Sequence, residues 1–326
     1  MSTETFAAAI DSATAEEMRL DDRVFLMATN PPAALRAEFG PERVREMPIA
    51  ESAMTGMAIG AAASGLRPIV QFSAVNFSFV AFDQMVNQAA RIRYMFGGQR
   101  EFPIVFRARY LNGTRSAAQH SQTGYAYYAH AGGIKLVVPS RVEDARGLFT
   151  AAIRDPNPVM FFEAERLGTL TDELVEGPSG PQELGVAVRR REGTDVTIVA
   201  IGYMVREALE AADALQQLGI SAEVIDPRTL VPLDVEAVKA SVRKTGRLVV
   251  VDESMPACSM ASEIITTIIE DPSMFSAMTA APRRVCTTPT PVPYSQVLED
   301  FVLPDRNDIV AAALDLTRGA LTSERN

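Results

Sequence analysis

The sequence predicts an α/β protein made of two doubly wound domains, and three observations carry this prediction. Short runs rich in β-branched residues alternate with longer stretches of helical periodicity along the chain, which is typical of parallel sheets covered by helices on both faces. At about 150 residues per domain, a chain of 326 residues is long enough for two cores. A segment without periodicity, which contains GPSGPQE and RRRE, separates the two alternating halves.

These patterns set the expected boundaries: a first domain over residues 1–175, a linker over 176–193 and a second domain over 194–326. The strands expected in the first domain span residues 24–28, 68–72, 104–109, 134–139 and 159–163. The helices expected between them span residues 4–20, 52–64, 78–95 and 142–154.

The second half continues the alternation. A strand over 196–201 precedes an amphipathic helix that ends at Gly219, where a left-handed cap is natural. Further strands are expected over residues 222–226, 248–252 and 284–287, with helices that begin near residues 234 and 260.

Charge and composition exclude several classes of partner. Lys and Arg number 31 against 41 Asp and Glu, a formal net charge of −10, so a nucleic-acid backbone would be repelled. The most apolar long window, residues 49–66, contains Glu51 and is mostly Ala, Gly and Ser, which falls short of a membrane span. Two cysteines, Cys258 and Cys286, suit a reducing compartment, and the acidic N-terminus shows no targeting pattern. We therefore expect a cytoplasmic protein that binds neither nucleic acid nor membranes.

Several motifs of cofactor and metal sites are absent from the sequence. It contains no GxGxxG and no GxxxxGK[ST], so the chain does not carry its own phosphate cradle. The histidines His120 and His130 stand without paired cysteines or HExxH spacing, which argues against zinc. No GxSxG elbow supports hydrolysis by a serine nucleophile.

Glu51 is the first candidate for chemistry. It lies where a strand-like stretch meets a helix whose small residues, Ala53, Gly56, Gly60 and Ser64, allow another backbone to approach closely. The structural alternative is that Glu51 only favours the N-terminus of this helix, where a carboxylate is stabilising. His120, in AAQHSQ, is equally open to a structural or a functional interpretation.

Many segments together resemble one family. They include PIAESAMTGMAIGAAASGLRPIVQF, NFSFVAFDQMVNQAARIRYMFGGQ, FPIVFR, AAQHSQ, GIKLVVPSRVEDARGL, AIRDPNPVMFFE, DVTIVAIGYMVREALEAADAL, VIDPRTLVPLD and KTGRLVVVDE. In this order, from about Val24 to Ala312, they are similar to the β subunits of the thiamine diphosphate-dependent 2-oxo acid dehydrogenases, in the transketolase superfamily, with pyruvate dehydrogenase the nearest type.

The resemblance implies a fold and an assembly. A pyrimidine-binding domain would be followed by a transketolase C-terminal-like domain, in an α2β2 heterotetramer whose cofactor lies between subunits. The α subunit would bind the diphosphate and its Mg²⁺, which agrees with the missing phosphate cradle.

The resemblance also implies roles for individual residues. Glu51 matches the glutamate that hydrogen-bonds N1′ of the aminopyrimidine and promotes loss of the C2 proton of the thiazolium. Ile49 and Phe77 match residues that pack against the pyrimidine ring, and His120 matches an active-site histidine near the thiazolium. His130 is expected to be structural.

The stretch AIRDPNP resembles a loop that binds K⁺ through carbonyl and side-chain oxygens. The positions carried over are Ile104, Ala152, Ile153, Asp155 and Asn157. The alternative is a plain Asp-Pro-Asn-Pro turn after a helix.

The implied activity is the decarboxylation of a pyruvate-like 2-oxo acid, with acyl transfer to a lipoyl acyltransferase. Thr29 and Asn30 stand where the family usually carries an acidic pair, and the segments ARYLNGTRS and SMPACSMASE lack expected glycines. These departures keep two alternatives open. One is a two-subunit transketolase-like or acyloin-forming carboligase, and the other is a degenerate subunit that serves as a scaffold.

Overall fold

A computed structural model describes residues 2–174 and 180–323. The chain divides into two compact units, residues 1–114 with 119–184 and residues 115–118 with 185–326. Part of the expected linker, residues 176–179, lies outside the described residues. Within the same expected linker the structure forms a strand, β9 (Val188–Arg191), whose residues are half-buried or exposed and therefore show no apolar periodicity.

The first unit is built on a parallel sheet, as the sequence predicts. Its strands lie in the order β6-β7-β5-β4-β2-β3, and every neighbouring pair is parallel. All residues of β2 and β7 are buried, because helices cover both faces of a doubly wound sheet. The strands are β2 (Val24–Ala28), β3 (Val44–Glu46), β4 (Arg67–Phe72), β5 (Val105–Tyr110), β6 (Lys135–Val137) and β7 (Val159–Ala164).

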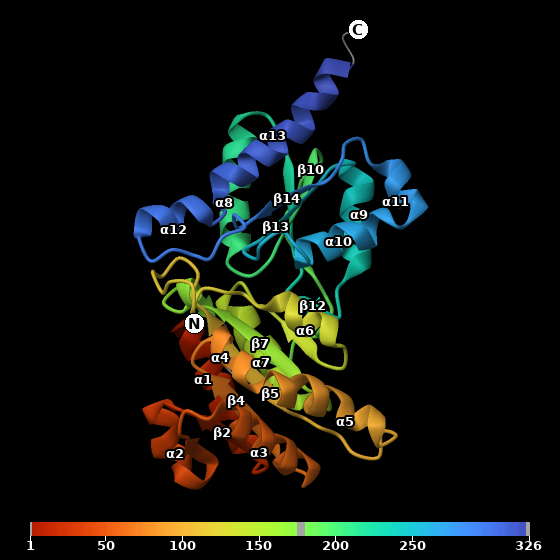
Figure 1. Ribbon diagram of the computed structural model, residues 1–326. Coiled ribbons are helices and arrows are strands. Elements are labelled where there is room, and N and C mark those ends of the chain that lie inside the picture. The colour runs from red at the N-terminus through yellow and green to blue at the C-terminus, as the bar shows by residue number, and fades with distance from the viewer. Residues whose placement is uncertain (1, 175–179, 324–326) are drawn as a thin grey trace. The chain divides into compact units, whose positions relative to one another are not determined.

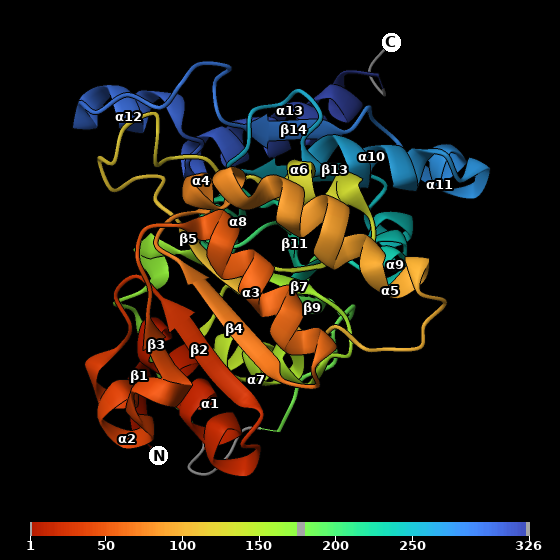
Figure 2. The same cartoon turned by 60° about the horizontal axis from the view of Figure 1, so that its bottom comes forward.

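The helices of this unit divide between the two faces of the sheet. On one face α1 (Phe6–Leu20) packs against α7 (Val142–Arg154). On the other, α3 (Glu51–Ala63) crosses β4 with α5 (Ala90–Met95) beside it (Figure 2). The remaining elements of the unit are β1 (Ser2–Thr5), α2 (Ala33–Arg43), α4 (Val75–Ser78), α6 (Tyr125–Ala131), the 3₁₀ turn η3 (Glu165–Leu167) and β8 (Thr171–Leu174).

The helix expected over residues 78–95 is divided into four pieces. After α4 come a 3₁₀ turn, η1 (Phe79–Ala81), a π-helical stretch, η2 (Gln84–Ala89), and then α5. Such wide and tight turns inside a helical segment are frequent at functional sites. The start of this broken helix carries Phe77.

Strand order places a topological switch beside β2. The chain moves outward from β2 to β3 and then returns to the other side of β2 to form β4. Ligands of doubly wound sheets bind outside the carboxyl ends of the strands at such a switch. Thr29 follows β2 and Ser73 follows β4, and their hydroxyls are 3.2 Å apart in a hydrogen bond across this point.

The second unit has its own sheet, in the order β14-β13-β10-β11-β9, with only β9 antiparallel. Helices α8 and α13 pack together on one face, and α9, α10 and α11 pack together on the other (Figure 1). The other strands of this sheet are β10 (Val196–Ala200), β11 (Ala222–Asp226), β13 (Leu248–Asp252) and β14 (Arg283–Cys286). The unit also contains β12 (Thr229–Val231), which is not part of this sheet. Its helices are α8 (Met204–Gln217), α9 (Val235–Thr245), α10 (Met260–Ile269), α11 (Pro272–Ala277), α12 (Gln296–Val302) and α13 (Arg306–Ser323).

The predicted strands and helices of this half are confirmed, including the left-handed Gly219 after α8. None of the helices within the described residues is both long enough and apolar enough to cross a membrane.

Candidate functional site

Glu51 begins α3 at the carboxyl edge of the sheet, five residues beyond the end of β3. Its side chain is buried, with 8% of the residue exposed. The helix N-cap is Ala50, which makes no side-chain capping bond. Within the described ranges, no group donates a hydrogen bond to the Glu51 carboxylate. The carboxylate therefore does not cap the helix by a hydrogen bond, and its acceptor oxygens are available to a ligand.

Phe77 and His120 are brought together by the fold. Phe77 belongs to α4, after β4, and His120 lies on the connection between β5 and α6. Their rings meet edge to face with centroids 5.2 Å apart, and both side chains are half-buried. A second contact joins the same segments, because the Asn76 amide donates to Gln122 Oε1 at 3.1 Å.

A buried hydroxyl pair fixes the position of α4. The hydroxyls of Ser78 and Tyr128 are 2.6 Å apart, and Ser78 also donates to the carbonyl of Val75. Burial raises the pKa of the Tyr128 phenol, so this group stays protonated at neutral pH. Since Ser78 follows Phe77 directly, this pair holds the Phe77 ring in place.

The start of α3 is tied to the same region. The hydroxyl of Ser52, next to Glu51, donates to the carbonyl of Val80 at 2.6 Å. Ile49, two residues before Glu51, is 84% exposed. An exposed aliphatic side chain two residues before a buried acid is available to pack against an aromatic ring of a ligand.

Three buried polar atoms near these residues have no hydrogen-bond partner within the described residues: Thr55 Oγ1, Asn76 Oδ1 and Ser121 Oγ. Thr55 follows Glu51 by one helical turn, Asn76 precedes Phe77, and Ser121 follows His120. Buried polar atoms are normally paired, so these three are available to the polar groups of a ligand. The residues present therefore fit a polar aromatic group such as an aminopyrimidine.

Sequence reasoning missed these three residues. Tertiary structure alone determines whether a polar atom lacks a partner, although the presence of Thr55 among apolar positions at helical spacing was a readable signal.

The small-residue face of α3 lies open in this chain. Ala53, Gly60 and Ser64 are exposed, and a Cβ added at Gly56 or Gly60 would meet no atom within 4 Å. The close approach that these residues permit is therefore not made by any described part of the same chain.

The five residues carried over for K⁺ lie in the last turn of α7 (Ala152, Ile153), in the oxygen-rich loop after it (Asp155, Asn157) and directly before β5 (Ile104). Their backbone carbonyls and side-chain oxygens already accept some hydrogen bonds: Ile104 from the Val159 amide at 2.9 Å, Ala152 from the Asp155 amide at 3.3 Å, Ile153 from Arg67 at 2.8 Å, and Asp155 from the Asn157 amide at 2.9 Å.

Two cations of the protein also reach this loop. Lys135 pairs with the Asp155 carboxylate, and Arg93 donates to the Asn157 side-chain oxygen. A carbonyl oxygen can accept twice, so the backbone carbonyls could still bind a cation, but an ammonium group already contacts the only carboxylate of the set.

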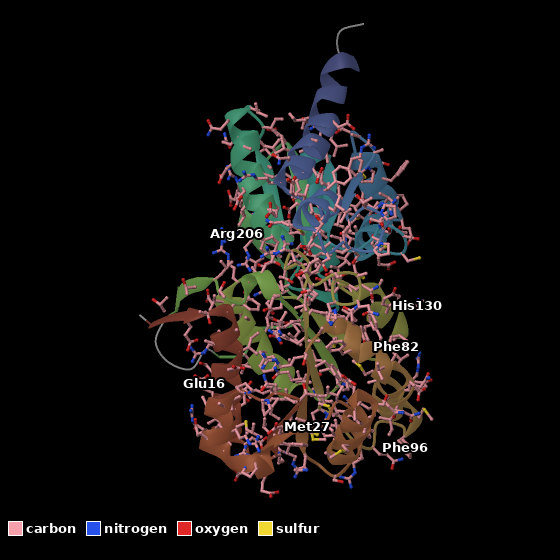
Figure 3. All side chains as sticks on the ribbon, turned by 60° about the vertical axis from the view of Figure 1, so that its left-hand side comes forward. Glu16, Met27, Phe82, Phe96, His130 and Arg206 are labelled. Carbon is pink, nitrogen blue, oxygen red and sulfur yellow. The ribbon has the colours of Figure 1, made fainter. Side chains whose placement is uncertain are left out.

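Other candidate centres are not supported. Over residues 2–174 and 180–323, no cluster of three His, Cys, Asp or Glu side chains could hold a metal ion. His130, labelled in Figure 3, is exposed on α6 and has no role in the arrangement around Glu51.

Comparison with known proteins gives matches over both units. The family model described as the transketolase pyrimidine binding domain matches residues 3–169, and that of the transketolase C-terminal domain matches residues 185–309. The mitochondrial pyruvate dehydrogenase E1 component subunit beta-2 of Oryza sativa subsp. japonica is 44% identical over 322 residues, which cover 95% of this chain and 85% of that protein.

Two further comparisons are with an oxidoreductase subunit named for another substrate and with a solved structure. The acetoin:2,6-dichlorophenolindophenol oxidoreductase subunit beta of Cupriavidus necator is 46% identical over 278 residues, which cover 85% of this chain and 81% of that protein. A solved structure described as a split-gene transketolase, inactive beta4 tetramer, superposes with a TM-score of 0.79 at 24% identity, covering 96% of this chain and 98% of that one. The last likeness concerns the fold alone.

Proposed function

Because the chain belongs to the transketolase-like family of β subunits found in thiamine diphosphate-dependent 2-oxo acid dehydrogenases, we propose that it acts as such a subunit in a heterotetramer with an α partner. The proposed reaction is the oxidative decarboxylation of a pyruvate-like 2-oxo acid, with transfer of the acyl group to a lipoyl acyltransferase. The observation that carries the proposal is the buried Glu51 carboxylate at the start of α3, which accepts no hydrogen bond within the described residues.

Each site residue has a defined task in this proposal. When bound, thiamine diphosphate supplies the nucleophilic carbon that adds to the oxo group and takes up the electrons released with CO₂. Glu51 holds a proton at N1′ of the pyrimidine, which is general acid–base work for a carboxyl group. Phe77 and Ile49 pack against the pyrimidine ring and exclude water. His120, whose ring contacts Phe77, would donate a proton near the reacting carbon.

The α partner has two tasks in the proposal. It binds the diphosphate and Mg²⁺, for which this sequence has no glycine-rich cradle. It also covers the open face of α3 (Gly56, Gly60 and their neighbours), where no described part of this chain packs. K⁺ at the oxygen-rich loop is a further part of the proposal, supported by the carbonyl and side-chain oxygens that Ile104, Ala152, Ile153, Asp155 and Asn157 carry.

One alternative substrate class has specific support. The acetoin oxidoreductase β subunits are 46% and 45% identical over 278 and 279 residues, close to the 44% over 322 residues of the pyruvate dehydrogenase subunit. Thr29 and Asn30 also stand where the family usually carries an acidic pair. An acyloin in place of a 2-oxo acid is therefore the second candidate. The rate at which the reconstituted enzyme reduces 2,6-dichlorophenolindophenol, measured once with acetoin and once with pyruvate as the substrate, distinguishes the two candidate substrate classes.

The decisive experiment replaces Glu51 by Gln, which keeps the shape but cannot cycle a proton. In the enzyme reconstituted with its α partner, exchange of the C2 hydrogen of bound thiamine diphosphate should slow by about 10²–10⁴. Circular dichroism should be unchanged, and Glu46→Gln, at an exposed position on β3, is the matched control. Exchange as fast as in the parent would reduce Glu51 to an acid at a helix N-terminus and remove the proposal's main support.

A further inference from the structure

Thr55 interrupts the apolar face by which α3 packs on the sheet. The buried residues of this helix are Glu51, Met54, Thr55, Ala58, Ile59 and Ala62, and beyond Glu51 only Thr55 carries a polar group. Thr55 has 0% exposure, and its hydroxyl has no partner among the residues described. Since it follows Glu51 by four residues, the two side chains lie one above the other on the same helix face.

The other buried helical threonines of this unit behave differently. Thr14 donates to the carbonyl of Ile10 at 2.8 Å, and Thr150 donates to that of Arg146 at 3.0 Å. Both follow the usual habit of a helical threonine, which bonds the carbonyl four residues earlier. Thr55 makes no such bond. A buried hydroxyl left unpaired lowers stability, whereas an isosteric valine at this position would avoid the loss.

We propose that Thr55 is a positioning residue for Glu51, and this inference rests on the proposed function. A cofactor over Glu51 would remove the remaining 8% of its exposure and with it the water that solvates the carboxyl group. One oxygen of the Glu51 carboxyl group is then hydrogen-bonded to N1′ of the pyrimidine, and the other needs a hydrogen-bond donor. The Thr55 hydroxyl supplies it from one turn below, after a change between the two χ1 rotamers that a helical threonine adopts.

The test compares Thr55→Val, Thr55→Ser and the control Thr14→Val in the full chain, with and without its α partner. Binding of thiamine diphosphate with Mg²⁺ to the reconstituted protein is measured by calorimetry. The Thr55→Val variant should bind thiamine diphosphate at least about tenfold more weakly than the parent, as expected for a lost hydrogen bond to a charged group. Thr55→Ser should restore binding. Thr14→Val should leave binding unchanged.

Thermal melting of the cofactor-free chain gives a readout independent of activity. Thr55→Val should melt at the same temperature as the parent or higher, whereas Thr14→Val should melt lower because a satisfied bond is lost. Parent-like binding by Thr55→Val, or a lowered melting temperature for it, overturns the role of Thr55. Failure of the parent itself to bind thiamine diphosphate with its partner would overturn the proposed function as well, so the two failures are distinguishable.

Discussion

At the residue scale, burial separates the two cysteines. Cys258 is exposed, whereas Cys286 ends β14 and is partly buried. Burial raises the pKa of the Cys286 thiol to about 12, and the nearby Asp252 carboxylate adds to the effect. An ordinary thiol ionises near pH 8.5, at roughly the value expected in the unfolded chain. Cys286 therefore stays a neutral thiol in the folded protein at a pH where the unfolded chain loses this proton.

The sign of the pH dependence follows from this shift. Between about pH 8.5 and about 12, the unfolded state binds fewer protons at Cys286 than the native state, so stability from this group is lost as the pH rises. The free energy of unfolding in urea should fall more steeply from pH 8 to pH 10 for the parent than for the Cys286→Ser variant. Parallel losses would contradict the assigned shift.

A second residue-scale prediction concerns the buried ion pair on β5 and β7. Arg107 donates to both carboxylate oxygens of Glu163, at 2.7 and 3.0 Å, and stacks 5.5 Å from the Phe149 ring centre. Burial opposes the charge of Arg107, but the Glu163 and Asp11 carboxylates outweigh burial and hold its pKa above the ordinary value. The two side chains are 5% and 6% exposed, so losing the Glu163 charge leaves a buried guanidinium whose remaining carboxylate contact is Asp11, at 3.1 Å.

We expect Glu163→Gln to lower the free energy of unfolding by about 3–5 kcal/mol. The neighbouring pair of Arg109 and Glu165 is 44% and 36% exposed, and Glu165→Gln should cost less than about 1 kcal/mol. Urea titrations of both variants at neutral pH measure the difference. Equal effects would mean that the buried pair is solvated in the native state.

At the element scale, the oxygen-rich loop after α7 is where an ion can be tested against a side chain. The Lys135 ammonium already contacts Asp155, the only carboxylate of the K⁺ set. If K⁺ binds at this loop, the Lys135→Met variant should bind K⁺ more tightly than the parent does, and the Asp155→Ala variant should not bind K⁺ there. Binding at a hundredfold excess over the dissociation constant stabilises by about 2.7 kcal/mol.

The measurement is thermal melting in K⁺ against a large organic cation for the parent, Lys135→Met and Asp155→Ala. We expect K⁺ to raise the melting temperature most in Lys135→Met and not at all in Asp155→Ala. Identical melting in the two salts for both the parent and Lys135→Met would leave the loop a plain turn held by Lys135 and Arg93.

Elements with strong periodicity could be predicted from the sequence, and elements defined by tertiary contacts could not. The helix expected over residues 142–154 is α7 with both ends as predicted, because apolar positions recur on one face. The helix α2 was not predicted, since Gly40, at φ 74°, and Pro41 interrupt its pattern. The expected helix over 78–95 is continuous in pattern but changes to 3₁₀ and π geometry, which periodicity cannot reveal.

The candidate site divides in the same way. Glu51 and His120 were ambiguous from residue chemistry alone, and the family resemblance of nine co-linear segments gave them roles. Whether the side-chain atoms of Thr55, Asn76 and Ser121 find partners depends on tertiary packing, and only Thr55, among apolar positions at helical spacing, left a local signal.

At the scale of the whole molecule, both units leave large apolar side chains in water. In the first unit Ile49, Val80 and Tyr94 are 84%, 68% and 90% exposed, and Phe96, labelled in Figure 3, is 57% exposed. In the second unit the exposed set is Tyr294, Val297, Leu298 and Phe301. Apolar side chains exposed in such numbers mark interaction surfaces. They support the proposal that this chain works only in an assembly.

The last prediction uses the open face of α3 to separate folding from assembly. Gly56 has ordinary helical geometry and no neighbour within 4 Å of an added Cβ, so Gly56→Leu should fold and should stabilise the isolated chain by up to about 1 kcal/mol through helix propensity. On a covered face the same side chain would clash with the α partner, so sedimentation should show loss of the heterotetramer. Ala214→Leu, at an exposed position on α8, is the control and should assemble as the parent does.

Cofactor binding then follows assembly. We expect the parent chain alone, and Gly56→Leu mixed with the α partner, to bind thiamine diphosphate weakly in calorimetry, because in neither case is the diphosphate cradle of the α partner assembled with the pyrimidine site of this chain. The parent and Ala214→Leu should bind it tightly once the partner is present. Tight, Mg²⁺-dependent binding by the isolated chain would show that this chain holds the diphosphate without its partner. Normal assembly of Gly56→Leu would show that the open face of α3 is ordinary surface and that the partner docks elsewhere.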